Sequence, residues 1–505
     1  MRLSSYTILS DPLPGGGYVL MNGYNGAIDL ISDKVALALV LYGKFRGPEG
    51  KYYTPKLREK QKHYLNYDRP KIDENSIEKF LPFEADLIDF FSKRGHLTKL
   101  SHVEEKELVK TMSEVLHEKA KKQPSFVLVP SLDCNYRCLY CYERVLQNSL
   151  DSDLSNVNYL KKNVVLSSDQ VDAIYKCINE LKKYHEDESN DKSITLYGGE
   201  PFNAANKELI YEIVSKGKLN GFTFSVITNG HDLEHFLPLI NKGGISHIQI
   251  TLDGPQKIHD RKRISADGTS SFNKIISNIH SLLNLTDLEI NIRVNLDKQN
   301  IEYFDELINQ LDKEGFLDYN NLFVYISPIT VKLCDSKIHT LITSKEITQF
   351  FGDRYKSRRN ICINSKFIDE IKSLNPSLLQ QKPHEIKSVA CAANVCEYIF
   401  TPDGFIYPCW ETLGLDEHKI GSYNLNGNVK INKEVAERWF NRHSAKIPQC
   451  LECSFCLLCS GGCAIHALYN NGTLYSNNCR GFNEELGTHI ANFVEEFAMV
   501  IQKHE

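Results

Sequence analysis

Three cysteines stand close together in the segment Cys134-Asn-Tyr-Arg-Cys138-Leu-Tyr-Cys141, with the spacing CxxxCxxC. Three thiolates hold three irons of a 4Fe–4S cluster and leave the fourth iron open. A structural zinc ion needs a fourth ligand close by, but the nearest histidines along the chain are His117 and His185. The spacing therefore favours an iron–sulfur cluster whose open iron binds a further ligand.

A second, denser group of cysteines lies towards the end of the chain. Of the 15 cysteines, nine fall between Cys391 and Cys479, and none precedes Cys134. In a reducing compartment such clustering indicates metal ligands rather than disulfides. Paired CxxC spacings suit tetrahedral zinc as well as iron–sulfur clusters, so spacing alone leaves both open. The isolated cysteines are interpreted as small buried hydrophobic residues; they are Cys177, Cys334 and Cys362.

The elements that position the first cysteines form a repeating pattern between residues 126 and 329. Strand-like apolar runs alternate with amphipathic helices at the spacing of a parallel sheet with right-handed crossovers. Six strands are too few to close an eight-stranded barrel, so we expect an α/β fold with an open, partial (β/α)6 TIM-like barrel. The predicted strands are 126–130, 194–197, 222–227, 247–252, 288–296 and 322–326, and the predicted helices are 168–184, 205–216, 233–242, 272–283 and 301–311.

Polar and glycine-containing segments end several of these strands, where the loops of such folds carry chemistry. The second strand ends in Tyr197-Gly198-Gly199-Glu200-Pro201, the third in Thr228-Asn229-Gly230 and the fourth in Thr251-Leu-Asp253-Gly254-Pro255. Two glycines, which lack Cβ, allow a ligand to approach the backbone closely. We therefore expect a ligand site beside the cysteine loop.

Together these features resemble the radical S-adenosylmethionine (SAM) superfamily. The triplet spacing, the aromatic Tyr140 just before the last cysteine and the Gly-Gly-Glu-Pro segment match that pattern. The resemblance implies that the open iron chelates the amino and carboxylate groups of S-adenosyl-L-methionine, which is cleaved to a 5′-deoxyadenosyl radical. It places the first cluster on Cys134, Cys138 and Cys141. The SAM contacts that it implies are Tyr140, Gly198, Gly199, Glu200, Thr228, Asn229, Thr251, Arg263 and Asn295.

The C-terminal cysteines resemble the SPASM extension of radical enzymes that modify peptides and proteins. This resemblance implies two auxiliary 4Fe–4S clusters with interleaved ligands, and hence three 4Fe–4S clusters per chain. The first auxiliary set is Cys391, Cys396, Cys409 and Cys463, and the second is Cys450, Cys453, Cys459 and Cys479. Cys456 is an additional cysteine that could replace a neighbour as ligand.

The first 120 residues contain no cysteine. Turn signals around 18–31 predict a small hairpin, and apolar periodicity predicts helices over 33–42, 77–93 and 104–119. A hairpin followed by helices resembles the winged-helix element with which ribosomal-peptide maturases capture a leader by strand addition. The basic stretch 44–62 is either a solvated loop or a docking surface for such a peptide.

We expect four regions in the chain. They are a small α+β, winged-helix-like domain (1–120), the radical SAM partial barrel (121–330), a bridging region (331–385) and a SPASM domain (386–505) that ends in a helix over 484–502. If the first region is separate, deleting residues 1–115 should spare cluster assembly.

Composition limits the partners and the compartment. The net charge of −5 and the mean hydropathy of −0.34 indicate a soluble globular chain without general affinity for nucleic acid or an acidic membrane surface. The apolar runs are far shorter than the roughly 20 residues that cross a bilayer. No apolar signal core follows Met1. We expect a cytoplasmic protein with no nucleic-acid or membrane partner.

The sequence thus predicts a radical SAM/SPASM peptide maturase that installs a thioether or carbon–carbon crosslink in a ribosomally synthesised precursor peptide. Its partners would be a precursor with a leader and an electron donor such as flavodoxin or ferredoxin. One alternative is an anaerobic sulfatase-maturing enzyme that makes formylglycine. That group typically has an aspartate after the cysteine matching Cys409, where this chain has Trp410. A non-enzymatic, zinc-stabilised adaptor is the alternative of another class, and no catalytic base is singled out.

Overall fold

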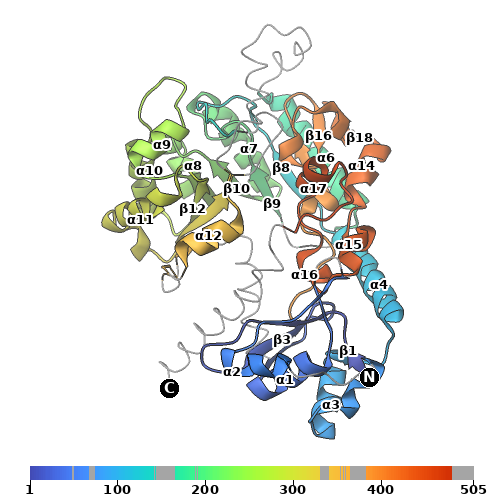
Figure 1. The fold of residues 1–505 in the computed structure, drawn as a ribbon. Helices are drawn as coiled ribbons and strands as arrows, with labels where there is room; N and C mark the ends of the chain where they lie inside the picture. The colour runs from blue at the N-terminus through green and yellow to red at the C-terminus, as the bar shows by residue number, and fades with distance from the viewer. Residues whose placement is uncertain are drawn as a thin grey trace. The chain divides into compact units, whose positions relative to one another are not determined.

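The structure is a computed structural model of the 505-residue chain (Figure 1). It describes residues 1–47, 50–66, 74–141, 143, 165–187, 189, 192–329, 341–352, 354–355, 358, 360–363 and 383–479. These residues fall into two compact units, each assembled from separate stretches of the chain. The first unit comprises Met1–Ala120, Lys366–Cys391 and Asn441–Glu505, and the second comprises Lys121–Ser365 and Ala392–Phe440. The expected helix over 484–502 and Cys334 lie outside the described residues.

The second unit is built on a parallel sheet whose first strands follow the chain in order. They are β8 (Ser125–Leu128), β9 (Ser193–Leu196), β10 (Thr223–Thr228), β11 (Ile245–Thr251), β12 (Glu289–Leu296) and β13 (Leu322–Pro328). A short strand, β14 (Ile361–Cys362), pairs in parallel with β13 at the sheet edge. Within the described ranges β14 and β8 are not paired, so the barrel is open, which confirms the predicted fold class.

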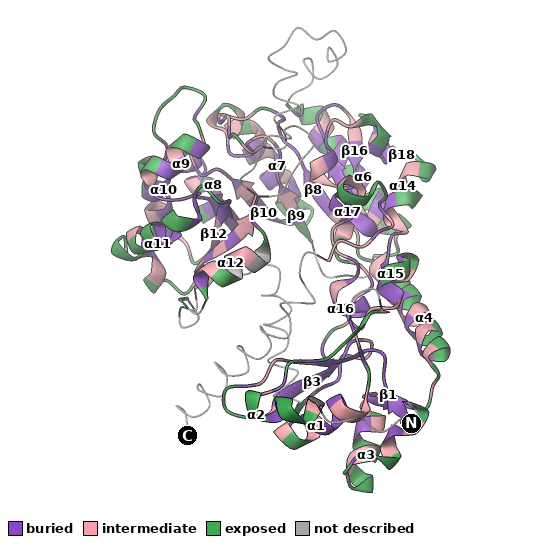
Figure 2. Ribbon diagram, viewed as in Figure 1, coloured by how far each residue is buried: buried purple, intermediate pink, exposed green. Residues whose placement is uncertain are grey.

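Helices connect these strands and cover the outer face of the sheet (Figure 1). They are α6 (Ser168–Tyr184), α7 (Lys207–Leu219), α8 (Leu237–Asn241), α9 (Gln256–Lys262), α10 (Phe272–Leu285), α11 (Phe304–Lys313) and α12 (Ser344–Phe351). Each longer helix buries one apolar face and exposes the other, as Figure 2 shows. Helix α6 begins at a capping box in which the Ser167 and Gln170 side chains satisfy the first backbone N–H groups. The short helix α9 was not predicted from the sequence.

Strand alternation decides which side chains face the inside of the sheet. In β10, Phe224, Val226 and Thr228 are buried, whereas Ser225 and Ile227 are only partly buried. Because successive side chains of a strand point to opposite faces, every second residue of β10 to β13 faces the concave side. These residues supply the walls of the pocket described below.

Residues 392–440 continue the same sheet. Strand β15 (Glu397–Phe400) pairs in parallel with β8, and β16 (Phe405–Tyr407), β17 (Gly421–Tyr423) and β18 (Val429–Ile431) follow in antiparallel order. Helix α14 (Lys433–Phe440) comes next along the chain. The region expected to form one SPASM domain therefore contributes residues 392–440 to the second unit and residues 441–479 to the first.

The first unit contains a three-stranded antiparallel sheet, β2 (Thr7–Leu9), β3 (Tyr18–Asn22) and β4 (Ile28–Ile31). The β3–β4 pair is the hairpin expected from the turn signals. The remaining strands of the N-terminal segment are the antiparallel pairs β1 (Arg2–Leu3) with β7 (Leu97–Thr98) and β5 (Phe45–Arg46) with β6 (Tyr52–Tyr53). Its helices are α1 (Asp33–Tyr42), α2 (Glu59–Lys62), α3 (Ala85–Lys93) and α4 (His102–Ala120).

One predicted helix of this unit is broken. Instead of a single helix over 77–93, the chain forms a 3₁₀ segment at Glu74–Lys79 and then α3. Pro82 lies between them, and proline disfavours a helical conformation in the residue before it.

The cysteine-dense segment of the first unit forms α15 (Pro448–Leu451), α16 (Cys456–Cys459) and α17 (Ala464–Asn471). One face of the three-stranded sheet packs directly on this segment: Ile8, Val19 and Met21 share a buried cluster with Phe455 and Leu458. The backbone O of Ser454 lies only 1.8 Å from where a Cβ on Gly23 would stand. The N-terminal sheet and the cysteine segment therefore form one core.

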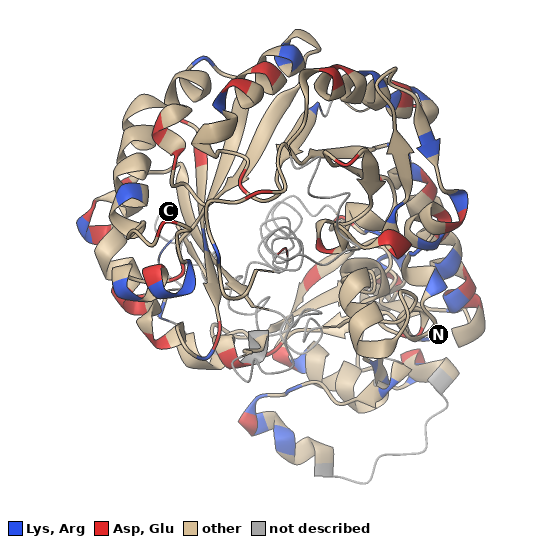
Figure 3. Cartoon of the chain, turned by 90° about the horizontal axis from the view of Figure 1, so that it is seen from above, with Lys and Arg blue, Asp and Glu red and all other residues tan. Residues whose placement is uncertain are grey.

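Charged residues of both signs are interspersed over the helices (Figure 3). In the basic stretch 44–62, at least five of the seven Lys or Arg side chains form ion pairs: Arg46 with Glu452, Lys56 with Asp11, Arg58 and Lys60 with Asp33, and Lys62 with Glu59. No helix in the described part of the chain is long and apolar enough to span a membrane.

Candidate active site

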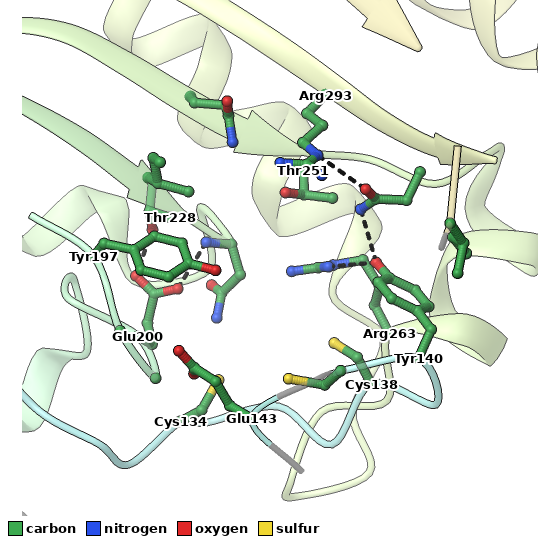
Figure 4. Close-up of a pocket in the computed structure, with 18 of the residues that line it drawn as sticks. Cys134, Cys138, Tyr140, Glu143, Tyr197, Glu200, Thr228, Thr251, Arg263 and Arg293 are labelled. Carbon is green, nitrogen blue, oxygen red and sulfur yellow. Dashed lines mark hydrogen bonds between the residues drawn. The ribbon is translucent and has the colours of Figure 1, made fainter. Parts of the chain in front are cut away.

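A pocket lies where the parallel strands of the second unit reach their carboxyl ends. The thiols of Cys134, Cys138 and Cys141 line it from the loop after β8 (Figure 4). Every SAM contact expected from the sequence also lines this pocket, namely Tyr140, Gly198, Gly199, Glu200, Thr228, Asn229, Thr251, Arg263 and Asn295. Among the described residues, no histidine and no fourth cysteine lines it. Three soft thiolates without a fourth protein ligand fit a 4Fe–4S cluster with one open iron.

The three thiols are strongly perturbed by their surroundings. Burial raises the pKa of Cys141 to about 12 and raises the pKa of Cys134 and Cys138 as well. The nearby Glu200 carboxylate raises the pKa of Cys134 further, whereas the Arg263 guanidinium lowers the pKa of Cys138 and Cys141. Because metal ligands must be deprotonated, cluster binding would displace these thiol protons.

The Glu200 carboxylate connects the end of β9 to the end of β10 through hydrogen bonds. Its Oε1 accepts from Thr228 Oγ1 (2.5 Å) and from the Phe202 N–H (2.8 Å), and its Oε2 accepts from the Asn229 N–H (2.7 Å). Burial raises the pKa of Glu200 to about 7, although these hydrogen bonds act in the opposite direction. A carboxylate has about four acceptor sites, so one site is left for a cationic ligand.

The two glycines before Glu200 allow the cysteine loop to approach β9. A Cβ on Gly199 would stand 2.1 Å from the backbone O of Asp133, the residue before the first cysteine. Gly198 has a φ of +130°, which L side chains rarely adopt. Asn229 Nδ2 ties the same loop to β10 by donating to Asn135 Oδ1 at 2.7 Å.

On the other side of the pocket, the Tyr140 hydroxyl joins several polar groups. It donates to Asp253 Oδ2 and accepts from Arg263 Nη1 (2.7 Å) and Asn295 Nδ2 (3.0 Å). The Arg263 Nε is buried without a hydrogen-bond partner among the described residues. A buried donor without an acceptor is costly, so this guanidinium is prepared to bind an anion.

The pocket also contains residues that the sequence did not single out for it: Glu143, Ile227, Gln249, Arg293, Pro328 and Ile329. Gln249 and Arg293 stand two positions before Thr251 and Asn295 on the same strands, so they face the same side. The two-residue period of side chains along a strand is the signal that could have identified Gln249 and Arg293. Glu143 follows the third cysteine by two positions and is buried.

The second auxiliary set predicted from the sequence lies within the first unit. Cys450, Cys453, Cys459 and Cys479 interact electrostatically, and burial raises the pKa of Cys459 to about 11. The fully buried Arg442 guanidinium lies among the thiols of Cys450, Cys459, Cys463 and Cys391 and donates to the backbone O atoms of Gly461 and Gly462 at 2.9 Å each. A buried cation beside several thiols favours their thiolate form.

Cys456 lies beside these thiols and interacts electrostatically with Cys450, Cys453 and Cys459. Only 2% of it is exposed, and it packs in an apolar cluster with Tyr6, Val109 and Ile447. Burial raises the pKa of its thiol to about 12, and Ser444 hydrogen-bonds to it. Cys450 belongs to the same cluster, so the replacement of a neighbouring ligand by Cys456 stays a prediction.

The first auxiliary set is divided between the two units. Cys391 and Cys463 belong to the first unit, and Cys396 and Cys409 belong to the second. The grouping of these four cysteines stays a prediction. Of the isolated cysteines, Cys177 is fully buried on α6, and Cys362 is half-buried on β14.

Comparisons with known proteins agree with this site. Residues 128–311 match the model of the radical SAM superfamily. The chain is 26% identical over 384 residues to a cysteine-type anaerobic sulfatase-maturating enzyme of Clostridium novyi, covering 72% of this chain and 94% of that enzyme. It is 22% identical over 359 residues to a radical SAM cyclopropyl synthase of Paramaledivibacter caminithermalis, covering 68% of this chain and 69% of that synthase.

Solved structures agree in fold. The structure of native anSMEcpe with bound AdoMet and Cp18Cys peptide aligns with a TM-score of 0.51 at 19% identity, covering 75% of this chain and 98% of that chain. The structure of the same protein with bound AdoMet alone gives a TM-score of 0.52.

An open parallel barrel with three cysteine thiols at the carboxyl ends of its strands defines a radical enzyme domain. The chain therefore contains a radical SAM domain within residues 128–311. It is therefore an enzyme, and the non-enzymatic zinc adaptor is set aside. This domain implies one 4Fe–4S cluster and S-adenosylmethionine.

Proposed function

We propose that this enzyme modifies a peptide or protein substrate by radical chemistry. The observation that carries the proposal is that the three thiols and all the expected strand-end residues line one pocket. Two findings support a peptide substrate: the sulfatase-maturating relative and the neighbouring fold solved with a bound peptide.

The pocket residues have different roles in this proposal. Cys134, Cys138 and Cys141 would hold the cluster, and the remaining acceptor site of Glu200 would take the methionyl ammonium. Arg263 would bind the methionyl carboxylate through its unpartnered Nε. Thr251 and Asn295 would contact the ribose, beside Tyr140, which orients Arg263 and Asn295 through its hydroxyl. When bound, the cluster and SAM supply a 5′-deoxyadenosyl radical that abstracts a substrate hydrogen atom.

We propose further that the product is a thioether or carbon–carbon crosslink in a ribosomally made precursor peptide. Trp410 supports this choice, because it replaces the aspartate typical of formylglycine-forming enzymes and packs against Tyr197 in a tilted arrangement with ring centroids 5.0 Å apart. The SPASM-like cysteines would hold two auxiliary 4Fe–4S clusters, and a flavodoxin or ferredoxin would supply electrons. We also propose that the enzyme is cytoplasmic.

A leader peptide is proposed to bind the N-terminal sheet by strand addition. Strand β4 lies at the edge of that sheet, and Leu30 on it is 62% exposed. Because most of the basic side chains in 44–62 are paired within the unit, recognition would depend on main-chain hydrogen bonds more than on those charges.

Formylglycine formation is the second candidate, and sequence similarity favours it. The test incubates reconstituted enzyme with SAM, a reductant, and candidate precursor and sulfatase-derived peptides. A product that keeps its cysteine sulfur in a new intramolecular bond supports crosslinking. A product that reacts with a hydrazide probe contains an aldehyde and supports formylglycine formation instead. If 5′-deoxyadenosine forms but no peptide changes, the peptide-modifying proposal is wrong.

A further inference from the structure

The deeper wall of the pocket is polar over three adjacent strands. Register pairs Thr251 on β11 with Arg293 on β12, and Arg293 with Tyr325 on β13. Gln249 stands two residues, or about 6–7 Å, further down β11 than Thr251. In Figure 4 Arg293 and Thr251 lie across the cavity from Cys134 and Cys138. The cofactor roles proposed for the strand ends do not account for this deeper layer.

Gln249 presents a buried donor to the pocket. Its side chain is only 8% exposed, and its Nε2 has no hydrogen-bond partner among the described residues. The Tyr325 hydroxyl donates to Gln249 Oε1, which fixes the orientation of the amide. The NH₂ group is therefore held in place without an acceptor, although a buried donor without an acceptor is costly.

Arg293 adds a fixed positive charge next to this donor. Its Nε donates to Asn295 Oδ1 and its Nη2 donates to Ser327 Oγ, each at 2.9 Å. Both acceptors are neutral, and within the described residues no carboxylate forms an ion pair with Arg293. A guanidinium that lines a pocket without a counter-charge is well suited to a carboxylate, which it can bind by charge-assisted hydrogen bonds.

We propose that Gln249 and Arg293 form a substrate subsite that binds a carboxylate group. This deepens the proposed function and rests on it: the carboxylate belongs to an acidic side chain close to the modified residue or to the carboxyl terminus of the peptide. The methionyl carboxylate of SAM is assigned elsewhere, because Arg263 is the cation that interacts with the Cys138 and Cys141 thiols. Arg293 interacts instead with Tyr197 and Tyr325.

The first test measures residue-specific protection in the full reconstituted chain. Phenylglyoxal modification of Arg293 is followed by peptide mass spectrometry, with N-acetylglutamate α-amide or N-acetylglutamine α-amide present. The glutamate probe should protect Arg293 and the glutamine probe should not. In Gln249→Leu, the glutamate concentration needed for protection should rise at least about tenfold, because the variant loses one hydrogen bond to a charged group. Arg438, exposed on α14, is the internal control whose modification neither probe should change. Equal protection by both probes, or by neither, overturns the subsite.

The second test separates the sources of the carboxylate. Peptide libraries with cysteine at a fixed position are incubated with the enzyme, one library ending in an amide and the other in a free carboxylate. Enrichment of Asp and Glu in the amide library identifies a side-chain carboxylate, and preference for the free-acid library identifies the terminus. Either preference should fall at least about tenfold in Arg293→Gln and persist in Arg438→Gln.

Three further outcomes keep the proposals apart. If peptides are modified without any carboxylate preference, the subsite is wrong although the peptide function stands. If the glutamate probe protects Arg293 but no peptide is bound or modified, the peptide function is wrong, and the carboxylate binding of Arg293 stands without its assignment to a peptide. If Arg293→Gln weakens SAM binding as much as Arg263→Gln does, the carboxylate is that of SAM and the proposal is overturned.

Discussion

At the scale of single residues, the Glu200 carboxyl group links the fold to the proposed cofactor. It accepts three hydrogen bonds from the ends of β9 and β10, and burial nevertheless raises its pKa to about 7. The group is therefore about half protonated in the free protein near neutral pH. A cationic ligand would bind the ionised form, so ligand affinity should follow this titration.

We predict that SAM affinity rises with pH through this range. The ionised fraction of a carboxyl group with a pKa of about 7 is roughly 0.1 at pH 6 and 0.8 at pH 7.5, so affinity should rise about eightfold between them. Equilibrium dialysis of SAM with reconstituted enzyme measures this change. Glu200→Gln should bind SAM more weakly and lose the pH dependence while keeping its iron.

Glu180→Gln is the matched control, because Glu180 is exposed on α6; its pH dependence should equal that of the unmodified enzyme. A Glu200→Gln variant with unchanged affinity and unchanged pH profile would reduce Glu200 to a purely structural residue.

The titration of Glu200 also affects the stability of the folded protein. Because the folded-state pKa is raised, Glu200 contributes most to stability below its ordinary pKa, and this contribution is lost as pH rises towards 7.

At the scale of elements, the pocket depends on how closely the cysteine loop approaches the end of β9. We predict that Gly199→Ala destabilises the second unit by at least about 2 kcal/mol, because the added Cβ would collide with backbone atoms of Leu132 and Asp133. Thermal unfolding and iron content measure the effect, and the variant should retain less iron. Gly15→Ala is the control, since a Cβ on Gly15 would meet no atom of the described residues within 4 Å. A fully stable Gly199→Ala variant with normal iron would contradict this account of the loop.

The sequence predicted the elements that carry strong periodicity. The helices over 33–42 and 168–184 have the predicted bounds, and the six parallel strands are present within a few residues of them. Strands β15 to β18 were not predicted, since they are three or four residues long and depend on pairing with one another and with β8. Short strands leave too little pattern for sequence reasoning to detect.

Within the pocket, too, some residues could be predicted from the sequence and others could not. Residues at strand ends were predicted because glycines and polar residues interrupt the apolar pattern there. Gln249 and Arg293 were missed because they lie inside strands, where no motif marks them and only the period of two shows which way they face. The division of the C-terminal cysteines between two units depends on tertiary packing that spacing does not encode.

At the scale of the whole molecule, the first 120 residues and the cysteine segment 441–479 share one core. Cys453 and Cys459 pack against the cluster that contains Ile8, Val19 and Phe455. Deleting residues 1–115 would therefore expose the cysteines of the proposed second auxiliary set. We now expect this deletion to cause iron loss, whereas the sequence predicted that cluster assembly would be spared. A point substitution tests this link more cleanly than a truncation.

We predict that Ile8→Ala destabilises the first unit by about 2–5 kcal/mol, because Ile8 is 1% exposed in that cluster. Iron content should fall by up to about four per chain, the content of one cluster. Cleavage of SAM should continue, since the three thiols of the pocket lie in the second unit. Calorimetry, iron analysis and 5′-deoxyadenosine assays measure these effects, with Val115→Ala, 63% exposed on α4, as the control. Normal stability and iron in Ile8→Ala would disprove the shared core.

The central claim is that Cys134, Cys138 and Cys141 hold the cluster that cleaves SAM. The most direct measurement compares iron content and 5′-deoxyadenosine formation in reconstituted enzyme and in the triple variant Cys134→Ala, Cys138→Ala and Cys141→Ala. The unmodified chain should hold about twelve irons and form 5′-deoxyadenosine with a reductant; the triple variant should hold roughly four irons fewer and form none. Continued cleavage of SAM by the triple variant would contradict the account.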